Sequence, residues 1–419
     1  MLWTLRLGKT VHRGFCRSFS STSKHPFPRI RSLGDVHSSR PSPEAHPEPS
    51  PPSDPISFVE RVRRPGAGRQ VLFFIFGSAL IYGVAAEQTN SNTRYWIERL
   101  GQSRAIWAVR APGNDEIRRA RFLELRMKWQ KGLDRLQQAI SGLPEDIKAM
   151  VSYSYTQTAD YFLKQREGTR VCYMIGAVNG LVWLAWQLPR LHPIMMRNFT
   201  HHPLSGLSYT MITSTFSHSS FMHLLFNTLA LSGFGAYAHH YLGQAQQSDS
   251  ARLPESTANW HFLAFFISAG MFSSVVSHVA ATRLTYPRLV SRLMSSKPLT
   301  ASPFATSAAA AASLETVASV IRPSLGASGA VYAAFTMTAM AFPETQISLI
   351  FPPTPPISIQ YGMAGMVALD IVGILRGWKM FDHYAHLGGA AFGLWYHAYG
   401  PQAWESFRRM TLKASPSPR

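Results

Sequence analysis

The chain has 419 residues, with 41 Lys and Arg against 22 Asp and Glu, so its formal net charge is +19. This charge would suit a nucleic-acid-binding protein, but there is no zinc-ligand spacing and no basic stripe interleaved with aromatic residues. Instead, the apolar residues collect in blocks long enough to cross a bilayer, which predicts a membrane protein without a nucleic-acid partner. Two cysteines, Cys16 and Cys172, indicate no disulfide framework.

The N-terminal region has the composition of a targeting segment followed by a linker. Residues 1–34 contain seven Lys or Arg, many serines and no Asp or Glu. A secretory signal would need a longer apolar core, so we predict a mitochondrial transit peptide, the alternative being a disordered basic tail. Residues 35–70 include seven prolines between Pro41 and Pro55, which predict a disordered linker.

Seven apolar blocks follow the linker and predict seven membrane spans. The first, residues 71–86, is separated from the others by a polar segment at 87–170 that we interpret as solvent-exposed helices. The remaining blocks form a predicted six-helix core at 171–400, followed by a C-terminal tail at 401–419. The expected fold is therefore an all-α polytopic membrane protein with one plus six spans, the core blocks being Val171–Gln187, Ser219–Tyr241, Trp260–Ala281, Leu325–Phe342, Gln360–Leu375 and His383–Tyr399.

The charges of the short loops predict the orientation. We assume that the transit peptide places the N-terminus in the matrix. The short loops on the opposite face, at 242–259 and 343–359, then contain a single basic residue, Arg252. This asymmetry agrees with the positive-inside rule and places the entry ends of spans three, five and seven on the matrix side. The basic residues of the matrix loops are Arg190, Arg197, Arg283, Arg288, Arg292, Lys297, Arg322, Arg376 and Lys379.

Strongly polar side chains inside spans are costly, so each is a candidate functional residue. They fall into three clusters, and each lies within one or two turns of the entry of span three, five or seven. All three clusters are therefore expected at a similar depth near one face of the membrane. The members that we single out are His218, His223, Asn227, Ser328, Tyr332 and His386.

The spacing of small residues brings two of these clusters together. Residues Gly389, Ala390 and Gly393 follow His386 at i+3, i+4 and i+7, which puts the imidazole on a stripe with almost no side-chain bulk. Such stripes let membrane helices approach closely, so His386 is expected within hydrogen-bonding reach of Ser328. This pair has the chemistry of a nucleophile with its general base.

The neighbouring polar residues suit the developing oxyanion of an acyl transfer. Its donors can be the Ser328 backbone N–H, the Asn227 amide and the His223 imidazole. A residue without a side chain, Gly326, lets backbone and substrate come close to the nucleophile. One turn after the serine, Tyr332 can hold a histidine ring by stacking.

Other polar residues have weaker functional interpretations. Near the interface, His218 could equally be a capping residue. One turn before His386, Asp382 could orient the imidazole, although a dyad needs no acid. We interpret His383 and Asp370 as structural, and we expect no metal and no cofactor. Each motif alone is compatible with helix packing, and their coincidence at one depth favours catalysis.

The motifs "HSSFMHLLFN", "GASGAVYA" and "AHLGGAAFG" resemble the three signatures of the rhomboid intramembrane serine proteases. The extra span, the transit peptide and the run "LRGWKMFDHYAHLGGAAFGLWY" resemble the mitochondrial PARL-type branch, in its fungal form. The resemblance covers about residues 170–400, although the loops at 242–259 and 282–323 are long for a compact bacterial-type core. It implies Ser328 as nucleophile and His386 as base, with the supporting residues His223, Asn227, Gly326, Tyr332 and His218.

The resemblance also implies an activity. Rhomboid proteases cleave single-span membrane proteins in or near the transmembrane segment without a cofactor. The mitochondrial members act on inner-membrane substrates such as a dynamin-like GTPase and, in fungi, cytochrome c peroxidase. The implied partners are therefore the lipid bilayer and single-span inner-membrane proteins, and the oligomeric state is not predicted.

Other functions remain alternatives. A zinc protease would need H-E-x-x-H and an aspartyl intramembrane protease would need G-x-G-D, and the sequence has neither. A rhomboid-like chaperone that binds membrane helices without cutting them is the main alternative. A transporter is a third, but the polar groups gather near one face and no repeat is present.

Overall fold

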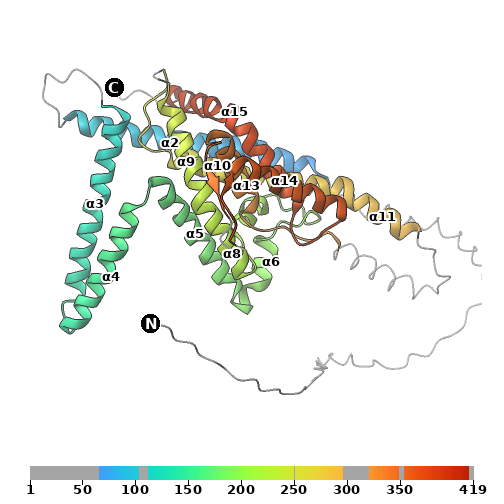
Figure 1. The fold of residues 1–419 in the computed structure, drawn as a ribbon, viewed down its shortest axis with the longest axis horizontal. Coiled ribbons are helices and arrows are strands. Elements are labelled where there is room, and N and C mark those ends of the chain that lie inside the picture. Colours follow the sequence, from blue (N-terminus) through green and yellow to red (C-terminus); the bar gives the residue numbers. More distant parts are fainter. Residues whose placement is uncertain (1–65, 103–111, 250, 296–319, 349–352, 415–419) are drawn as a thin grey trace, which may run out of the picture. The chain divides into compact units, whose positions relative to one another are not determined.

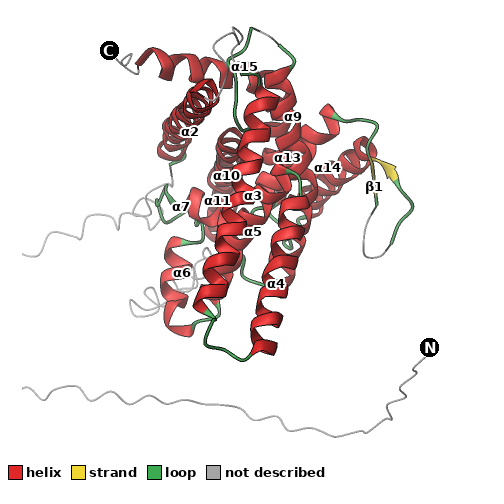
Figure 2. Cartoon of the chain, turned by 90° about the vertical axis from the view of Figure 1, so that its left-hand side faces the viewer, coloured by secondary structure: helices red, strands yellow, loops and turns green. Residues whose placement is uncertain are grey.

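The structure is a computed structural model that describes residues 66–102, 112–249, 251–295, 320–348 and 353–414 (Figure 1). The predicted transit peptide and most of the predicted linker lie outside these residues. The described part is almost entirely helical, with one short pair of strands (Figure 2). The expectation of an all-α polytopic membrane protein is thereby confirmed.

The first described helix, α2, spans Gly68–Gln102. It continues well past the predicted span at 71–86, so the segment predicted to be soluble begins inside this helix. Two further helices, α3 (Asn114–Ala139) and α4 (Glu145–Lys164), form a hairpin. The hairpin is tied by the Tyr155 hydroxyl, which donates to the Trp129 carbonyl at 3.0 Å.

Within the described residues, the core contains six helical stretches, and two of them include a π-helical turn. The first, α5 (Glu167–Trp186), is followed by the short turns and helices of a long connecting loop. That loop consists of η1 (Pro189–Leu191), α6 (His192–Asn198), α7 (Thr210–Thr213) and η2 (Ser214–Phe216). The other stretches are α8 (Phe221–Ala230) with η3 (Leu231–Gly235) and α9 (Ala236–Gln247), α10 (Asn259–Ala280) with η4 (Ala281–Thr285) and α11 (Tyr286–Ser295), α13 (Ser328–Ala341), α14 (Ile359–Arg376) and α15 (His383–Ala414). The strands β1 (Gln346–Ile347) and β2 (Ile357–Ser358) pair antiparallel between α13 and α14.

Several helices are longer than their predicted spans. The helical stretch that begins at α8 continues to Gln247, the one that begins at α10 continues to Ser295, and α15 continues through the predicted C-terminal tail to Ala414. The extensions carry charged or polar residues, which end an apolar block without ending a helix. Hydropathy therefore does not predict the helix ends.

Composition alone identifies fewer spans. Within the described residues, three helices are long and apolar enough to cross a membrane, namely α2, α10 extended to Arg292, and α14. The pair formed by α5 and η1–α6, bent by 94°, would make a fourth. The stretches that begin at α8, α13 and α15 do not qualify, because they are short or interrupted by polar residues. These three carry the predicted site.

Helix α13 is buried along most of its length and packs against α10, α14 and α15. Glycines on α15 make the closest approach possible. A Cβ atom at Gly389 would lie 2.1 Å from the Gly329 carbonyl oxygen, and one at Gly393 would lie 2.2 Å from the Ala333 carbonyl oxygen. The predicted small-residue stripe therefore brings the backbones of α13 and α15 into direct contact.

The opposite end of α15 is fixed by a buried polar group of residues, which we call the distal network: Asn90, Glu255, Trp404 and Arg408. The Arg408 guanidinium donates to Asn90 Oδ1 at 2.9 Å and to the Pro254 carbonyl at 2.7 Å. The Trp404 indole donates to the Glu255 carboxylate at 3.1 Å, and Glu255 is fully buried. These bonds join α2, the loop before α10 and α15.

Candidate active site

The predicted nucleophile and base lie side by side. Ser328 is the first residue of α13 and His386 lies in the first turn of α15. The Ser328 Oγ and His386 Nε2 atoms are 3.0 Å apart. The glycine stripe of α15 makes this distance possible, because a larger residue at Gly389 would push the two helices apart.

The second nitrogen of the same imidazole meets a carboxylate. Asp370 on α14 places its Oδ1 atom 3.1 Å from His386 Nδ1 and 2.5 Å from His383 Nδ1. Because an ionised carboxylate can only accept hydrogen bonds, Nδ1 of His386 must carry the proton. The Nε2 atom that faces Ser328 is then free to accept one. Serine, histidine and aspartate thus form a continuous hydrogen-bonded row.

The polypeptide that leads into the serine is held at three points. Ser324 pairs with His201 through two backbone hydrogen bonds of 2.9 and 3.0 Å. The Gly326 N–H donates to the Ser214 carbonyl at 2.9 Å. The Ala327 N–H donates to Nε2 of the fully buried His218 at 3.3 Å. His218 therefore fixes the entry to the serine rather than facing the reacting atoms.

The position before this hydrogen bond requires a glycine. Gly326 has φ of +125°, a conformation that side-chain-bearing residues rarely adopt. A Cβ atom there would also lie 2.7 Å from the His223 ring. His223 packs in turn edge-on against His218, with ring centroids 4.9 Å apart. The predicted oxyanion histidine thus lies over the backbone just before Ser328.

The two remaining predicted residues occupy different positions. Tyr332 stacks on His386 with ring centroids 4.3 Å apart and an interplanar angle of 13°. Asn227 is buried, but its amide donates to the His223 carbonyl one turn earlier on α8 at 2.9 Å. This bond uses one of the two N–H groups of the amide, so the other is available to an oxyanion.

The acidic residue next to His386 is Asp370 and not Asp382, which the sequence had suggested as an orienting acid. Asp382 accepts from the Ser277 hydroxyl at 2.6 Å and from the Ala385 N–H at 3.1 Å, so it caps α15. Asp370, which the sequence analysis treats as structural together with His383, takes the position against His386. The spacing held a signal: Asp370 precedes the end of α14 by six residues and His386 follows the start of α15 by three, which puts them at similar depth in an antiparallel pair.

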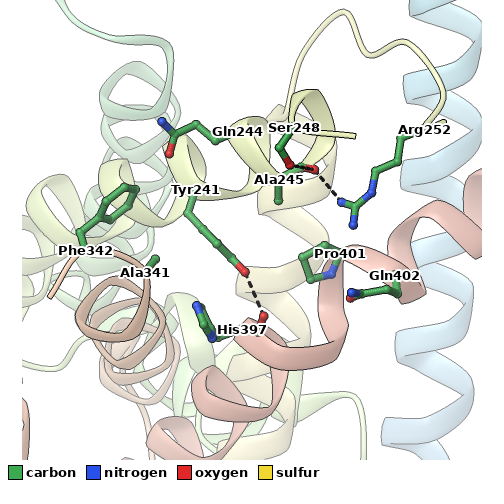
Figure 3. Close-up of a pocket in the computed structure, with 10 residues that line it drawn as sticks. All are labelled: Tyr241, Gln244, Ala245, Ser248, Arg252, Ala341, Phe342, His397, Pro401 and Gln402. Carbon is green, nitrogen blue, oxygen red and sulfur yellow. Dashed lines mark hydrogen bonds between the residues drawn. The ribbon is translucent and has the colours of Figure 1, made fainter. Parts of the chain in front are cut away.

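A pocket of about 400 Å³ lies elsewhere, between α9, the end of α13 and α15 (Figure 3). One of its lining residues, His397, follows His386 by eleven residues, about 16 Å along α15. Because Pro401 has no N–H, the His397 carbonyl is left without its helical donor and accepts from the Tyr241 hydroxyl at 2.9 Å. This pocket does not include the serine or the histidine.

Comparison with known proteins agrees with this geometry. The Rhomboid domain matches residues 205–402, which contain every residue of the predicted site. This part of the chain is therefore a Rhomboid domain.

Curated relatives narrow the branch. The chain is 32% identical over 235 residues to the mitochondrial presenilin-associated rhomboid-like proteins of Rattus norvegicus and Homo sapiens, covering 56% of this chain and 49% of each relative. It is 26% identical over 249 residues to the mitochondrial Rhomboid protein 1 of Saccharomyces cerevisiae, covering 58% and 57%. These relatives and the apolar helices indicate a mitochondrial, multi-pass membrane protein whose Rhomboid domain is similar to that of the PARL type. The chain spans about half the length of the relatives it matches.

Proposed function

We propose that this protein is an intramembrane serine protease of the mitochondrial inner membrane. Its substrates are single-span membrane proteins, cut in or near the transmembrane segment. The observation that carries the proposal is the 3.0 Å approach of Ser328 Oγ to His386 Nε2, with Asp370 on the other side of the imidazole. Mitochondrial rhomboid relatives support the same activity.

In the acylation step, Ser328 Oγ attacks the scissile carbonyl carbon while its proton passes to His386 Nε2. The imidazolium that forms is stabilised by the Asp370 carboxylate, which stays ionised. When the C–N bond breaks, His386 returns the proton to the leaving amine. Water then attacks the acyl-serine by the same proton path, releasing the second product and restoring Ser328.

The negative charge of the tetrahedral intermediate needs donors on one side of the serine. The backbone N–H of Ser328 belongs to the first turn of α13, where helix N–H groups have no intrahelical partner. The His223 ring over Gly326 supplies one side-chain donor. The Asn227 amide supplies another through its second N–H, while the first donates to the His223 carbonyl. Two or three such donors are what an oxyanion requires.

A peptide bond in a transmembrane helix is hydrogen-bonded and inaccessible. The substrate must therefore present an extended stretch to the serine, which favours helix-weakening residues near the cut. A dynamin-like GTPase and cytochrome c peroxidase of the inner membrane are candidate substrates by family resemblance.

The proposal is tested by processing of a single-span inner-membrane substrate in mitochondria that carry wild type, Ser328→Ala or His386→Ala. Both variants should accumulate uncut substrate, with a rate loss of about 10⁴-fold or more, because each removes a reacting group. The matched control is Ser268→Ala, which changes a buried serine on α10 whose hydroxyl has no hydrogen-bond partner. If Ser328→Ala cuts as wild type does at equal protein level, the proposal fails.

The second candidate is a rhomboid-like chaperone that binds membrane helices without cutting them. With such a chaperone, the level of the client protein would depend on the presence of the chaperone but not on its Ser328 side chain. The same experiment separates the two, because a chaperone would protect or retain its client equally in wild type and Ser328→Ala.

A further inference from the structure

Three potential metal ligands converge behind the serine. His383 and His386 of α15 and Asp370 of α14 place one ligand atom each within 4.8 Å of one another. All three are buried, with relative exposures of 4%, 8% and 2%. The proposed reaction needs only one of the two imidazoles, so the presence of His383 calls for an explanation.

The fold makes specific room for this second imidazole. A Cβ atom at Gly373, three residues after Asp370 on α14, would lie 2.4 Å from the His383 ring. Any larger residue at Gly373 would exclude the ring from the carboxylate. Among the described residues, His383 Nε2 and Asp370 Oδ2 are buried without a hydrogen-bond partner, and the Tyr332 hydroxyl also faces this carboxylate. The site is therefore built to hold His383 Nδ1 against Asp370, at a cost in unsatisfied polar atoms.

We propose that Asp370, His383 and His386 form an inhibitory zinc site. Two imidazole nitrogens and one carboxylate oxygen are a common zinc ligand set, and a water molecule would complete the tetrahedron. Zinc bonds of about 2.0–2.2 Å require ligand atoms roughly 3.3 Å apart. The present separations of 2.5 and 3.1 Å from Asp370 Oδ1 reach this value with shifts below about 1 Å.

Zinc at this position blocks the proposed acylation. The metal binds the unprotonated Nδ1 atom of each imidazole, so the protons now held there leave to solvent or move to Nε2. His386 then carries its proton at Nε2 and cannot accept the one from Ser328. The Asp370 carboxylate would also bind the metal and would no longer accept the hydrogen bond that orients the His386 imidazole. This inhibition rests on the proposed protease function, whereas the metal binding does not.

Binding is measured on the full-length Ser328→Ala protein in detergent micelles, with Co²⁺ as a spectroscopic probe for the zinc position. We expect visible ligand-field bands of a tetrahedral site that Zn²⁺ abolishes. The His383→Gln change, added to Ser328→Ala, should weaken Co²⁺ binding at least tenfold, the smallest loss typical of metal-site partners. The control is His397→Gln, in the middle of α15 and about 16 Å along the helix from His386. The absence of bands, or equal loss in both variants, overturns the site.

Inhibition is measured on the protease with Ser328 intact, each variant relative to its own zinc-free rate. Wild type should lose cleavage on titration with Zn²⁺ and recover it with a chelator, and His383→Gln should need at least tenfold more Zn²⁺. Equal sensitivity of the two overturns inhibition through this cluster. If no variant cleaves any substrate, the protease proposal fails while the Co²⁺ measurement still decides the metal site.

Discussion

The two ends of α15 are built on different principles. At its start, His386 meets Ser328 and Asp370 through single hydrogen bonds and ring stacking, among glycines and small residues. At its other end, Arg408 and Trp404 are embedded in the distal network, which ties α15 to α2 and to the loop before α10. The bonds at the site end join groups that react or orient the reacting imidazole, and the bonds at the distal end join side chains that take no part in the proposed reaction.

This difference separates chemistry from anchoring. A substrate segment must enter between helices near Ser328, so strong polar ties there would oppose access. A buried network at the far end can hold the same helix in register without obstructing the substrate. Substitutions at the site end should therefore reduce the reaction rate with little loss of stability, and those at the distal end should do the reverse.

The largest expected effect on rate without loss of a reacting group is that of Asp370→Asn. It removes the acceptor that fixes the His386 tautomer, so cleavage should fall by about 10²- to 10⁴-fold with an unchanged thermal midpoint. The measurement is the cleavage rate of a single-span substrate in micelles. Asp382→Asn, which alters the cap of α15 and its bond to the Ser277 hydroxyl, serves as the control. A rate within threefold of wild type for Asp370→Asn would mean that the dyad acts alone.

Next in size is the loss of stability from Arg408→Met. The change leaves the Pro254 carbonyl and Asn90 Oδ1 without their donor, and it removes the positive charge that most favours the ionised Glu255. The free energy of unfolding should fall by on the order of 3–5 kcal/mol. The thermal midpoint in micelles should drop, while the rate per folded molecule stays the same. Arg409→Met, at a half-exposed ion pair, should change stability by no more than about 1 kcal/mol. Equal midpoints for the two variants would contradict an anchoring role.

A smaller effect is expected from Gly326→Ala. The positive φ and the contact of the added Cβ with His223 should cost about 1–3 kcal/mol of strain. Because the strain falls beside the nucleophile, kcat should decrease more than the thermal midpoint. Gly206→Ala, which has φ of +69° and open space around it, is the matched control. Similar kcat values for both variants would show that the His223 contact is unimportant.

The smallest effect concerns pH. Burial raises the pKa of the Glu255 carboxyl to about 7, against the opposing influence of Arg408. The folded protein then binds a proton on Glu255 between about pH 4.5 and 7 that the unfolded chain has lost. Stability should therefore fall as pH rises through this range and level off above it, by on the order of 2–3 kcal/mol. Glu255→Gln should flatten the dependence of the thermal midpoint between pH 5 and 8. A wild-type midpoint that does not change with pH would contradict the assignment.

The sequence indicated the site better than its surroundings. The pairing of Ser328 with His386 was predictable because glycines at helical spacing indicate the face on which two membrane helices can come into contact. The position of Asp370 was indicated only by its distance from the end of α14, which becomes informative once the turn between α14 and α15 is known. The carbonyl that the Asn227 amide binds could not be predicted, because it depends on local side-chain conformation.

The distal network could not be predicted from the sequence. Asn90 and Arg408 are 318 residues apart, and their bond depends on the packing of α2 against α15. No sequence motif predicts such a contact, because Asn and Arg are common residues in polar segments. Long-range polar pairs of this kind follow from the tertiary fold rather than from local pattern.

The shortness of α13 has a consequence for the surrounding lipid. Fourteen residues of α-helix extend about 21 Å, whereas the hydrocarbon layer of a bilayer is about 30 Å thick. If the far end of α13 reaches one boundary of this layer, Ser328 lies about 9 Å below the other. Water must descend to the serine, or the bilayer must thin around the protein. Acyl-chain length should therefore set how far the hydrolytic water has to travel.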